Sequence, residues 1–148
     1  MLGLLRVLDR LPSMSFERWV ALELTLVLTA LAALALGLLA SAAVTDATQA
    51  TLALPMICFP QVLFAGALVP TSQMAAVGRG LSLGLADRWS FEALGRVVHV
   101  DRILGDAALP ADYRDALVGS PVSSWLTLLV LTAVGLLLTT TVLARRTA

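Results

Sequence analysis

Lysine is absent from this chain of 148 residues, and only 14% of the residues carry a charge. Ten arginines balance ten acidic residues, so no basic excess points to a nucleic-acid partner. A phosphate-binding loop of the pattern GxxxxGK[ST] needs a lysine and is therefore excluded. We expect this chain to bind neither nucleic acid, nor ATP in the Walker manner, nor any other cofactor.

Cysteine and histidine each occur once. Cys58 cannot form an internal disulfide, and its position in an apolar stretch favours a small apolar residue over a reactive thiol. His99 has no Ser-centred elbow and no metal-ligand cluster beside it in the sequence, so we expect no catalytic residue, no metal site and no enzyme. A cleavable signal peptide is not expected either, because charges and a proline interrupt the run "MLGLLRVLDRLP".

Apolar residues are abundant, at 59% of the chain, and the mean hydropathy is +0.91. They gather in three long blocks, at residues 19–44, 48–69 and 124–143. Each block approaches or exceeds the roughly 20 residues that cross about 30 Å of hydrocarbon as a helix. The sequence therefore predicts a single all-α integral membrane domain, residues 1–148, with three transmembrane helices embedded in the lipid bilayer.

The first block carries small residues at every fourth position: Thr29, Ala33, Gly37 and Ser41. This spacing places them on one ridge of a helix, where another helix can approach closely. We interpret the ridge as a helix-packing surface. The alternative is that an alanine-rich sequence produces such a ridge by chance.

The second block, which follows the first after a short polar turn, contains Pro55 and Pro60, with Gln61 beside the second proline. Each proline removes a backbone hydrogen bond from a helix, and a polar amide inside the bilayer needs a partner or a wet cavity. One interpretation is a kinked packing helix whose Gln61 bonds to a neighbour. The other is a helix that lines a solute path, with Phe59 and Phe64 as aromatic surface.

More than fifty residues connect the second and third blocks. Residues 70–100 predict a re-entrant or amphipathic helical segment, and residues 101–122 an external loop. Asp87 is expected to cap a helix in which Arg88 and Glu92 form an i, i+4 pair. One apolar face is predicted for this helix, made by Trp89, Ala93, Leu94 and Val97.

The segment "LGLLASAAVTDATQATLALPMICFPQVLFAGALVP", followed by "RWSFEALGR", resembles the permease domain of type-2 ABC exporters, those similar to the G subfamily. The resemblance covers residues 19–148 and matches only the last three of six family spans, the C-terminal half. It implies that residues 52–69 are the fifth span, lining a central cavity at a dimer interface. By the same resemblance, Arg88, Trp89 and Glu92 belong to an external re-entrant region.

The resemblance also implies partners. Because this chain has no phosphate-binding loop, an ABC ATP-binding subunit or domain would hold ATP and Mg, and other chains would supply the remaining permease spans in a homo- or heterodimer. Asp87 departs from the family pattern, which has proline before the "RW". The alternative function is a non-transporting membrane scaffold, or an orphan fragment that assembles through helix packing.

Two observations oppose each other on the orientation in the membrane. Eight arginines lie on the side of the long loop and two, Arg145 and Arg146, on the other side, which alone would place the loop in the cytoplasm. The resemblance implies the reverse. We adopt the implied orientation, because the loop arginines alternate with acids and because preceding spans would orient the N-terminal flank. The expected location is the inner, cytoplasmic membrane of the cell, with the C-terminus in the cytoplasm.

Overall fold

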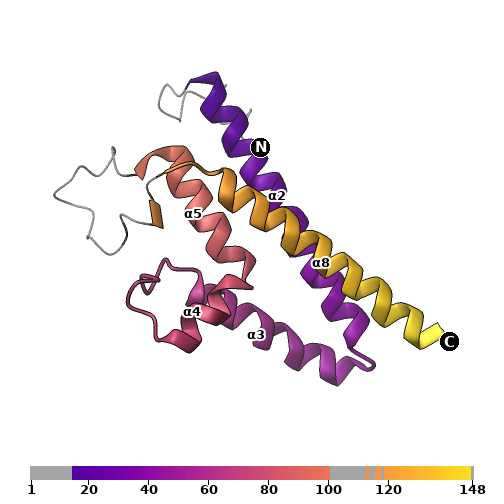
Figure 1. Ribbon diagram of the computed structural model, residues 1–148. Helices are drawn as coiled ribbons and strands as arrows, with labels where there is room; N and C mark the ends of the chain where they lie inside the picture. Colours follow the sequence, from indigo (N-terminus) through magenta and orange to yellow (C-terminus); the bar gives the residue numbers. More distant parts are fainter. Residues whose placement is uncertain (1–14, 101–112, 114–115, 118, 148) are drawn as a thin grey trace.

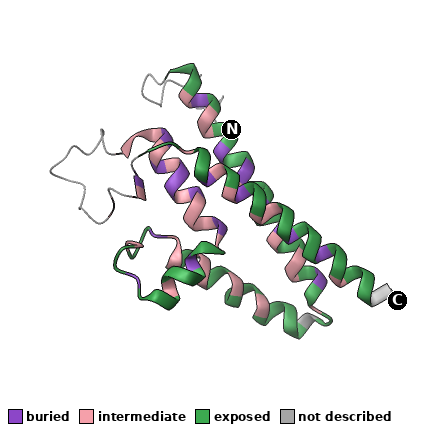
Figure 2. Cartoon of the chain, in the orientation of Figure 1, coloured by how far each residue is buried: buried purple, intermediate pink, exposed green. Residues whose placement is uncertain are grey.

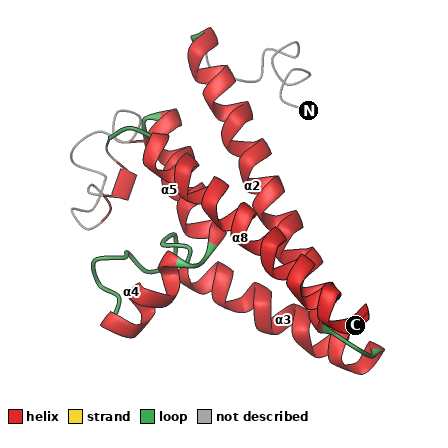
Figure 3. Ribbon diagram, turned by 45° about the vertical axis from the view of Figure 1, so that its right-hand side comes forward, coloured by secondary structure: helices red, strands yellow, loops and turns green. Residues whose placement is uncertain are grey.

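The computed structural model describes residues 15–100, 113, 116, 117 and 119–147. Its helices are α2 (Phe16–Ala43), α3 (Ala47–Phe64), α4 (Ala76–Leu83), α5 (Ala86–Val98) and α8 (Val122–Thr147). Figures 1 and 3 show these helices and no strand in the part of the chain that is described. The all-helical expectation is confirmed. Most of the expected external loop, and the first twelve residues discussed for a signal peptide, lie outside the described residues.

Helices α2 and α8 are long and apolar enough to cross a membrane, judged by length and composition. They lie along one another over much of their length (Figure 1). Their contact is close at Gly135 of α8, because a Cβ added to this glycine would lie only 3.1 Å from the Cβ of Ala35 in α2. The Trp125 indole Nε1 donates a hydrogen bond of 2.8 Å to the Thr25 hydroxyl across this contact. Small residues allow the close approach, and the hydrogen bond satisfies the one polar group of the indole.

Helix α3 begins where the Asp46 carboxylate accepts a hydrogen bond from the Thr48 amide at 3.0 Å. It continues through Pro55 and Pro60 without interruption. The helix ends after Phe64, short of residue 69 where the predicted span ends, because Gly66 takes a left-handed φ of 87°. With 18 residues α3 is about 27 Å long, so it is a shorter apolar helix and the third span remains a prediction.

The turn between α2 and α3 is short, as predicted, but the two helices diverge from it (Figures 1 and 3). Contacts between α2 and α3 are sparse, whereas α8 and α5 both pack well against α2. Figure 2 shows the consequence: between residues 48 and 64 of α3 no residue is buried, while α5 is the most buried of the described helices. The hairpin expected from the sequence is therefore splayed.

Helix α5 fills the space beside α2 and α8. Ala86, at its start, joins Leu28, Ala32 and Leu128 in one buried apolar cluster, which places that end near the middle of α2. Its predicted apolar face is confirmed: Ala93 and Val97 are buried, and Trp89 and Leu94 are half-buried. Asp87 does not cap the helix. The cap position is Leu85, which has an extended backbone. Asp87 lies in the first turn, where a carboxylate stabilises the helix by its attraction to the positive end of the helix dipole.

Candidate functional site

A groove with a volume of about 680 Å³ opens between the diverging helices α2 and α3. We call it the α2–α3 groove. From α2 and the turn it is lined by Ala33, Leu36, Gly37, Ala40, Ser41, Val44, Thr45 and Asp46. From α3 it is lined by Ala50, Ala53, Leu54, Ile57, Cys58 and Gln61. Its volume lies within the range of pockets that take small organic molecules.

The chemistry of this lining is mostly apolar, and much of it is contributed by small side chains. A Cβ added at Gly37 would meet no atom within 4 Å, which shows how open the wall is there. Asp46 is the one charged residue of the lining, and no arginine contributes to it. The polar groups sit toward the two ends, with Thr45 and Asp46 at the turn and Gln61 near the end of α3.

The structure brings one of the five predicted solute-path residues, Gln61, into the α2–α3 groove. Phe59 is 69% exposed on another face of α3, and Pro55 is also exposed. Phe64 packs toward Gly78 of α4, where its Cε1 lies 3.2 Å from the position of a Cβ, and it lines a second hollow of about 420 Å³. Pro60 is half-buried and outside the groove lining.

Sequence reasoning missed the other α3 residues of the groove, although a signal was present. The lining positions 50, 53, 54, 57, 58 and 61 follow helical spacing and form one face of α3. That face carries small and medium-sized side chains, whereas the prolines and aromatics drew attention to other faces.

The small-residue ridge of α2 lies beside the contact with α8 rather than in it. Ala33, Gly37 and Ser41 line the α2–α3 groove, and the half-buried Thr29 hydroxyl donates to the Thr25 carbonyl at 2.8 Å. The contact with α8 instead uses the neighbouring face, with Leu28 and Ala35. Helix packing on the ridge itself remains a prediction.

A second polar feature lies on α5, where Glu92 binds two arginines. Arg88 Nε donates to Glu92 Oε1 at 3.1 Å, and Arg96 Nη2 donates to Glu92 Oε2 at 3.2 Å. The exposed fractions of the three side chains are 13% for Arg88, 6% for Glu92 and 11% for Arg96. Each carboxylate oxygen thus has its own cation, one helical turn before and one after Glu92. We call these three residues the α5 triad.

The α5 triad connects three segments of the chain. Arg96 donates to the Ala116 and Ser120 carbonyls at 2.9 and 3.3 Å and to the hydroxyls of Ser123 and Ser124. It therefore holds α5 to the start of α8. On the other side, Arg88 Nη1 donates to the Ser82 hydroxyl at 2.7 Å, which joins α5 to the end of α4. The Arg88–Glu92 pair predicted from the sequence is confirmed. The bonds of Arg96 to the start of α8 were missed because those partners are distant in sequence.

Trp89 completes this cluster. The Arg88 guanidinium lies 4.9 Å from its ring centroid, and the indole Nε1 donates to the Leu83 carbonyl at 2.9 Å. Of the three predicted residues of the re-entrant element, Arg88 thus contacts both of the others, Trp89 and Glu92. Burial raises the pKa of the neighbouring Asp87 carboxyl.

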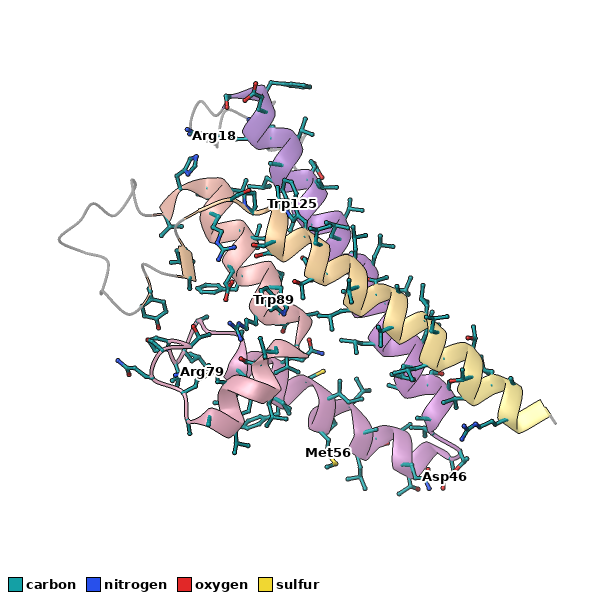
Figure 4. The ribbon with its side chains drawn as sticks, viewed as in Figure 1. Arg18, Asp46, Met56, Arg79, Trp89 and Trp125 are labelled. Atoms are coloured by element: carbon teal, nitrogen blue, oxygen red, sulfur yellow. The ribbon has the colours of Figure 1, made fainter. Side chains whose placement is uncertain are left out.

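Figure 4 relates the two features. Asp46 lies at the α2–α3 turn, far from Trp89 and from the end of the molecule that carries Arg18 and Trp125. The groove therefore extends from one end toward the interior, while the α5 triad lies toward the other end. Within the described ranges, no group of three or more His, Cys, Asp or Glu side chains could hold a metal ion.

Comparison with known sequence families matches residues 12–94 to the family described as ABC-2 type transporter. The matched segment includes α2, α3, α4 and most of α5. Comparison with curated proteins and with solved structures gives no match.

Proposed function

Because this chain belongs to the ABC-2 type transporter family, we propose that it forms part of the membrane permease of an ATP-driven exporter. The family match extends over more than half of the chain of 148 residues. Domains of this family are membrane components of transport and not catalytic. The two membrane-length helices agree with a membrane-embedded protein.

The observation that carries the transport proposal is the α2–α3 groove. A protein that served only as a scaffold would be expected to close the space between consecutive membrane helices by packing. Here the helices diverge and leave an apolar groove of about 680 Å³ with polar groups near both ends. Such a groove can shelter an apolar solute from water while the polar ends orient it.

Finer features belong to the same proposal. The exposed apolar side chains of α3, among them Leu52, Met56 and Phe59, offer a surface for a second permease subunit or for further spans. We propose that α3 lies within the bilayer as a span of the G-subfamily type, despite its short length. The chain would then supply the C-terminal half of a permease that contains a dimer interface.

The first prediction concerns the ATPase. The chain is expected to copurify from its native membrane with a protein that bears an ATP-binding cassette, because it has no lysine for a phosphate-binding loop. The measurement is affinity purification in mild detergent followed by mass spectrometry. An unrelated multi-pass protein from the same membrane, carrying the same tag, is the control. Recovery of this chain with no cassette protein above that control would contradict the proposal.

The orientation proposal is supported by the bonding of the loop arginines. Arg79 donates to the Ser72 carbonyl at 3.1 Å, Arg88 to Glu92 and Ser82, and Arg96 to Glu92 and the segment at the start of α8. The statistical rule that places arginines in the cytoplasm counts the arginines of loops near the ends of the membrane spans. Arginines that are bonded inside the protein weigh less in that count, which favours an external loop.

The second prediction tests this orientation. Ser120→Cys and Ala148→Cys, each in a Cys58→Ser background, are treated on intact cells with a thiol reagent that does not cross membranes. We expect labelling at position 120 and none at position 148 until the cells are permeabilised. The opposite pattern would show that the C-terminus is outside and that the arginine count was the better guide.

A further inference from the structure

We propose that the α2–α3 groove binds amphiphiles with a single apolar chain and a cationic head group, the head group lying beside Asp46. The assignment of such an amphiphile as the exported solute rests on the proposed function. Its binding does not, so the two can be tested separately.

We infer a cationic head group from the charge of the groove lining. Asp46 is the one charged residue in the lining of the groove, and no arginine lies in it to repel a cation. The Asp46 carboxylate accepts one hydrogen bond in the structure, at Oδ1 from the Thr48 amide. A carboxylate offers about four acceptor positions, so it can bind a cation while it still caps α3. Both ion pairs found among the described residues belong to Glu92, in α5, and not to Asp46.

We infer a ligand with a single apolar chain from the length and the apolar wall of the groove. The α3 side of the lining extends from Ala50 to Gln61, which is about 17 Å at 1.5 Å per residue. Between the polar ends this wall is apolar, with Ala53, Leu54 and Ile57. The turn that holds Asp46 lies at the ends of both helices, where a charged head group can stay hydrated while its chain lies between α2 and α3.

Cys58 provides a reporter that needs no mutation. It is the single cysteine of the chain, it is exposed, and it lines the groove between Asp46 and Gln61. The full chain is reconstituted in phosphatidylcholine nanodiscs, and the rate of Cys58 alkylation by N-ethylmaleimide is followed by mass spectrometry. Hexadecyltrimethylammonium is the cationic probe, and hexadecyl sulfate is the anionic probe with the same chain.

We expect the cationic probe to slow alkylation at concentrations about tenfold lower than those the anionic probe needs. The Asp46 carboxylate attracts the cationic head group and repels the anionic one. Asp46→Asn should abolish this preference but keep α3 capped, because asparagine caps helices as well as aspartate does. Glu23→Gln, which removes an exposed acid of α2 outside the groove, should leave the preference intact. Gly37→Leu should reduce protection by both probes, because its side chain would enter open groove space.

A second control separates binding in the groove from a general effect of charged amphiphiles on the bilayer. Leu52→Cys, in a Cys58→Ser background, places the thiol on an exposed face of the same helix outside the groove. We expect neither probe to slow its alkylation. Equal protection of positions 52 and 58, equal potency of the two probes, or a preference that survives Asp46→Asn would each overturn the proposal.

Two further outcomes would also overturn it. In the first, Cys58 does not react with N-ethylmaleimide even without a probe, while the cysteine of the Leu52→Cys variant does react. This result would show that bilayer lipid or a protein helix already fills the groove. Alkylation unaffected by either probe would show that no amphiphile binds. Neither outcome depends on an ATPase, so a failure here leaves the proposed transport function to its own test.

Discussion

Glu92→Ala is expected to lower the free energy of unfolding by about 3–5 kcal/mol, the cost of leaving buried charges without their partner. Glu92 is buried and binds both Arg88 and Arg96. Its removal leaves two largely buried guanidinium groups one above the other without a counter-charge. The Arg96 bonds to the start of α8 would then have to hold a cation that nothing neutralises, so we expect the contact between α5 and α8 to loosen first.

Thermal unfolding in mild detergent, followed by tryptophan fluorescence, measures this effect. Glu23→Gln, at an exposed position, is the matched control and should change little. Replacing the whole α5 triad, by Arg88→Met, Glu92→Leu and Arg96→Met together, should destabilise less than Glu92→Ala alone, because no unpaired buried charge remains. If Glu92→Ala unfolds at the temperature of the Glu23→Gln control, the α5 triad does not stabilise the fold.

Gln61→Leu is expected to leave the amount of folded protein unchanged and to lower export by about two- to tenfold, the equivalent of one lost hydrogen bond. Gln61 lines the α2–α3 groove and is half-buried. Within the described part of the chain its side-chain amide has no hydrogen-bond partner, so its replacement strands no polar group of this chain. The amide is instead placed to meet a solute or a partner chain.

Pro60→Ala is the companion variant. Alanine supplies the backbone N–H that proline lacks, and α3 is already helical at this position, so we expect an equal or greater yield of folded protein. Export should fall if the proline shapes the solute path. Membrane-inserted protein and transport are measured together in the reconstituted complex, with Val130→Leu, at an exposed position of α8 outside the groove, as the control. If folded protein and transport decrease in the same proportion, Pro60 and Gln61 serve packing and the solute-path interpretation is wrong.

Several elements were predictable because their causes are local. The apolar blocks specify α2 and α8, and the spacing of Arg88 and Glu92 specifies an ion pair within one helix. The end of α3 was also within reach, since Gly66 follows the apolar helix and glycine commonly adopts the left-handed conformation that terminates one. The span predicted from apolar length runs five residues beyond the end of that helix.

Other elements depend on partners far apart in the chain. The bonds that join Arg96 to the start of α8 could be assigned only when α5 was seen beside α8, because these acceptors lie 20 or more residues away in sequence. The ridge of α2 looked suited to helix packing, yet the fold uses the adjacent face for α8 and leaves the ridge on a groove wall. A helical pattern identifies the residues of a face, but it does not tell which neighbour that face meets.

The sequence by itself determined that these 148 residues are helical and membrane-embedded and contain no GxxxxGK[ST] loop, because hydropathy, helix length and residue type are properties of the chain alone. Only the tertiary structure decided that α2 and α3 diverge, that the resulting groove carries one carboxylate and no arginine, and that the α5 triad is buried. In a bilayer, apolar faces are equally well solvated by lipid and by other helices. Small differences in packing and hydrogen bonding therefore choose which faces meet, and those differences arise only between segments that the fold brings together.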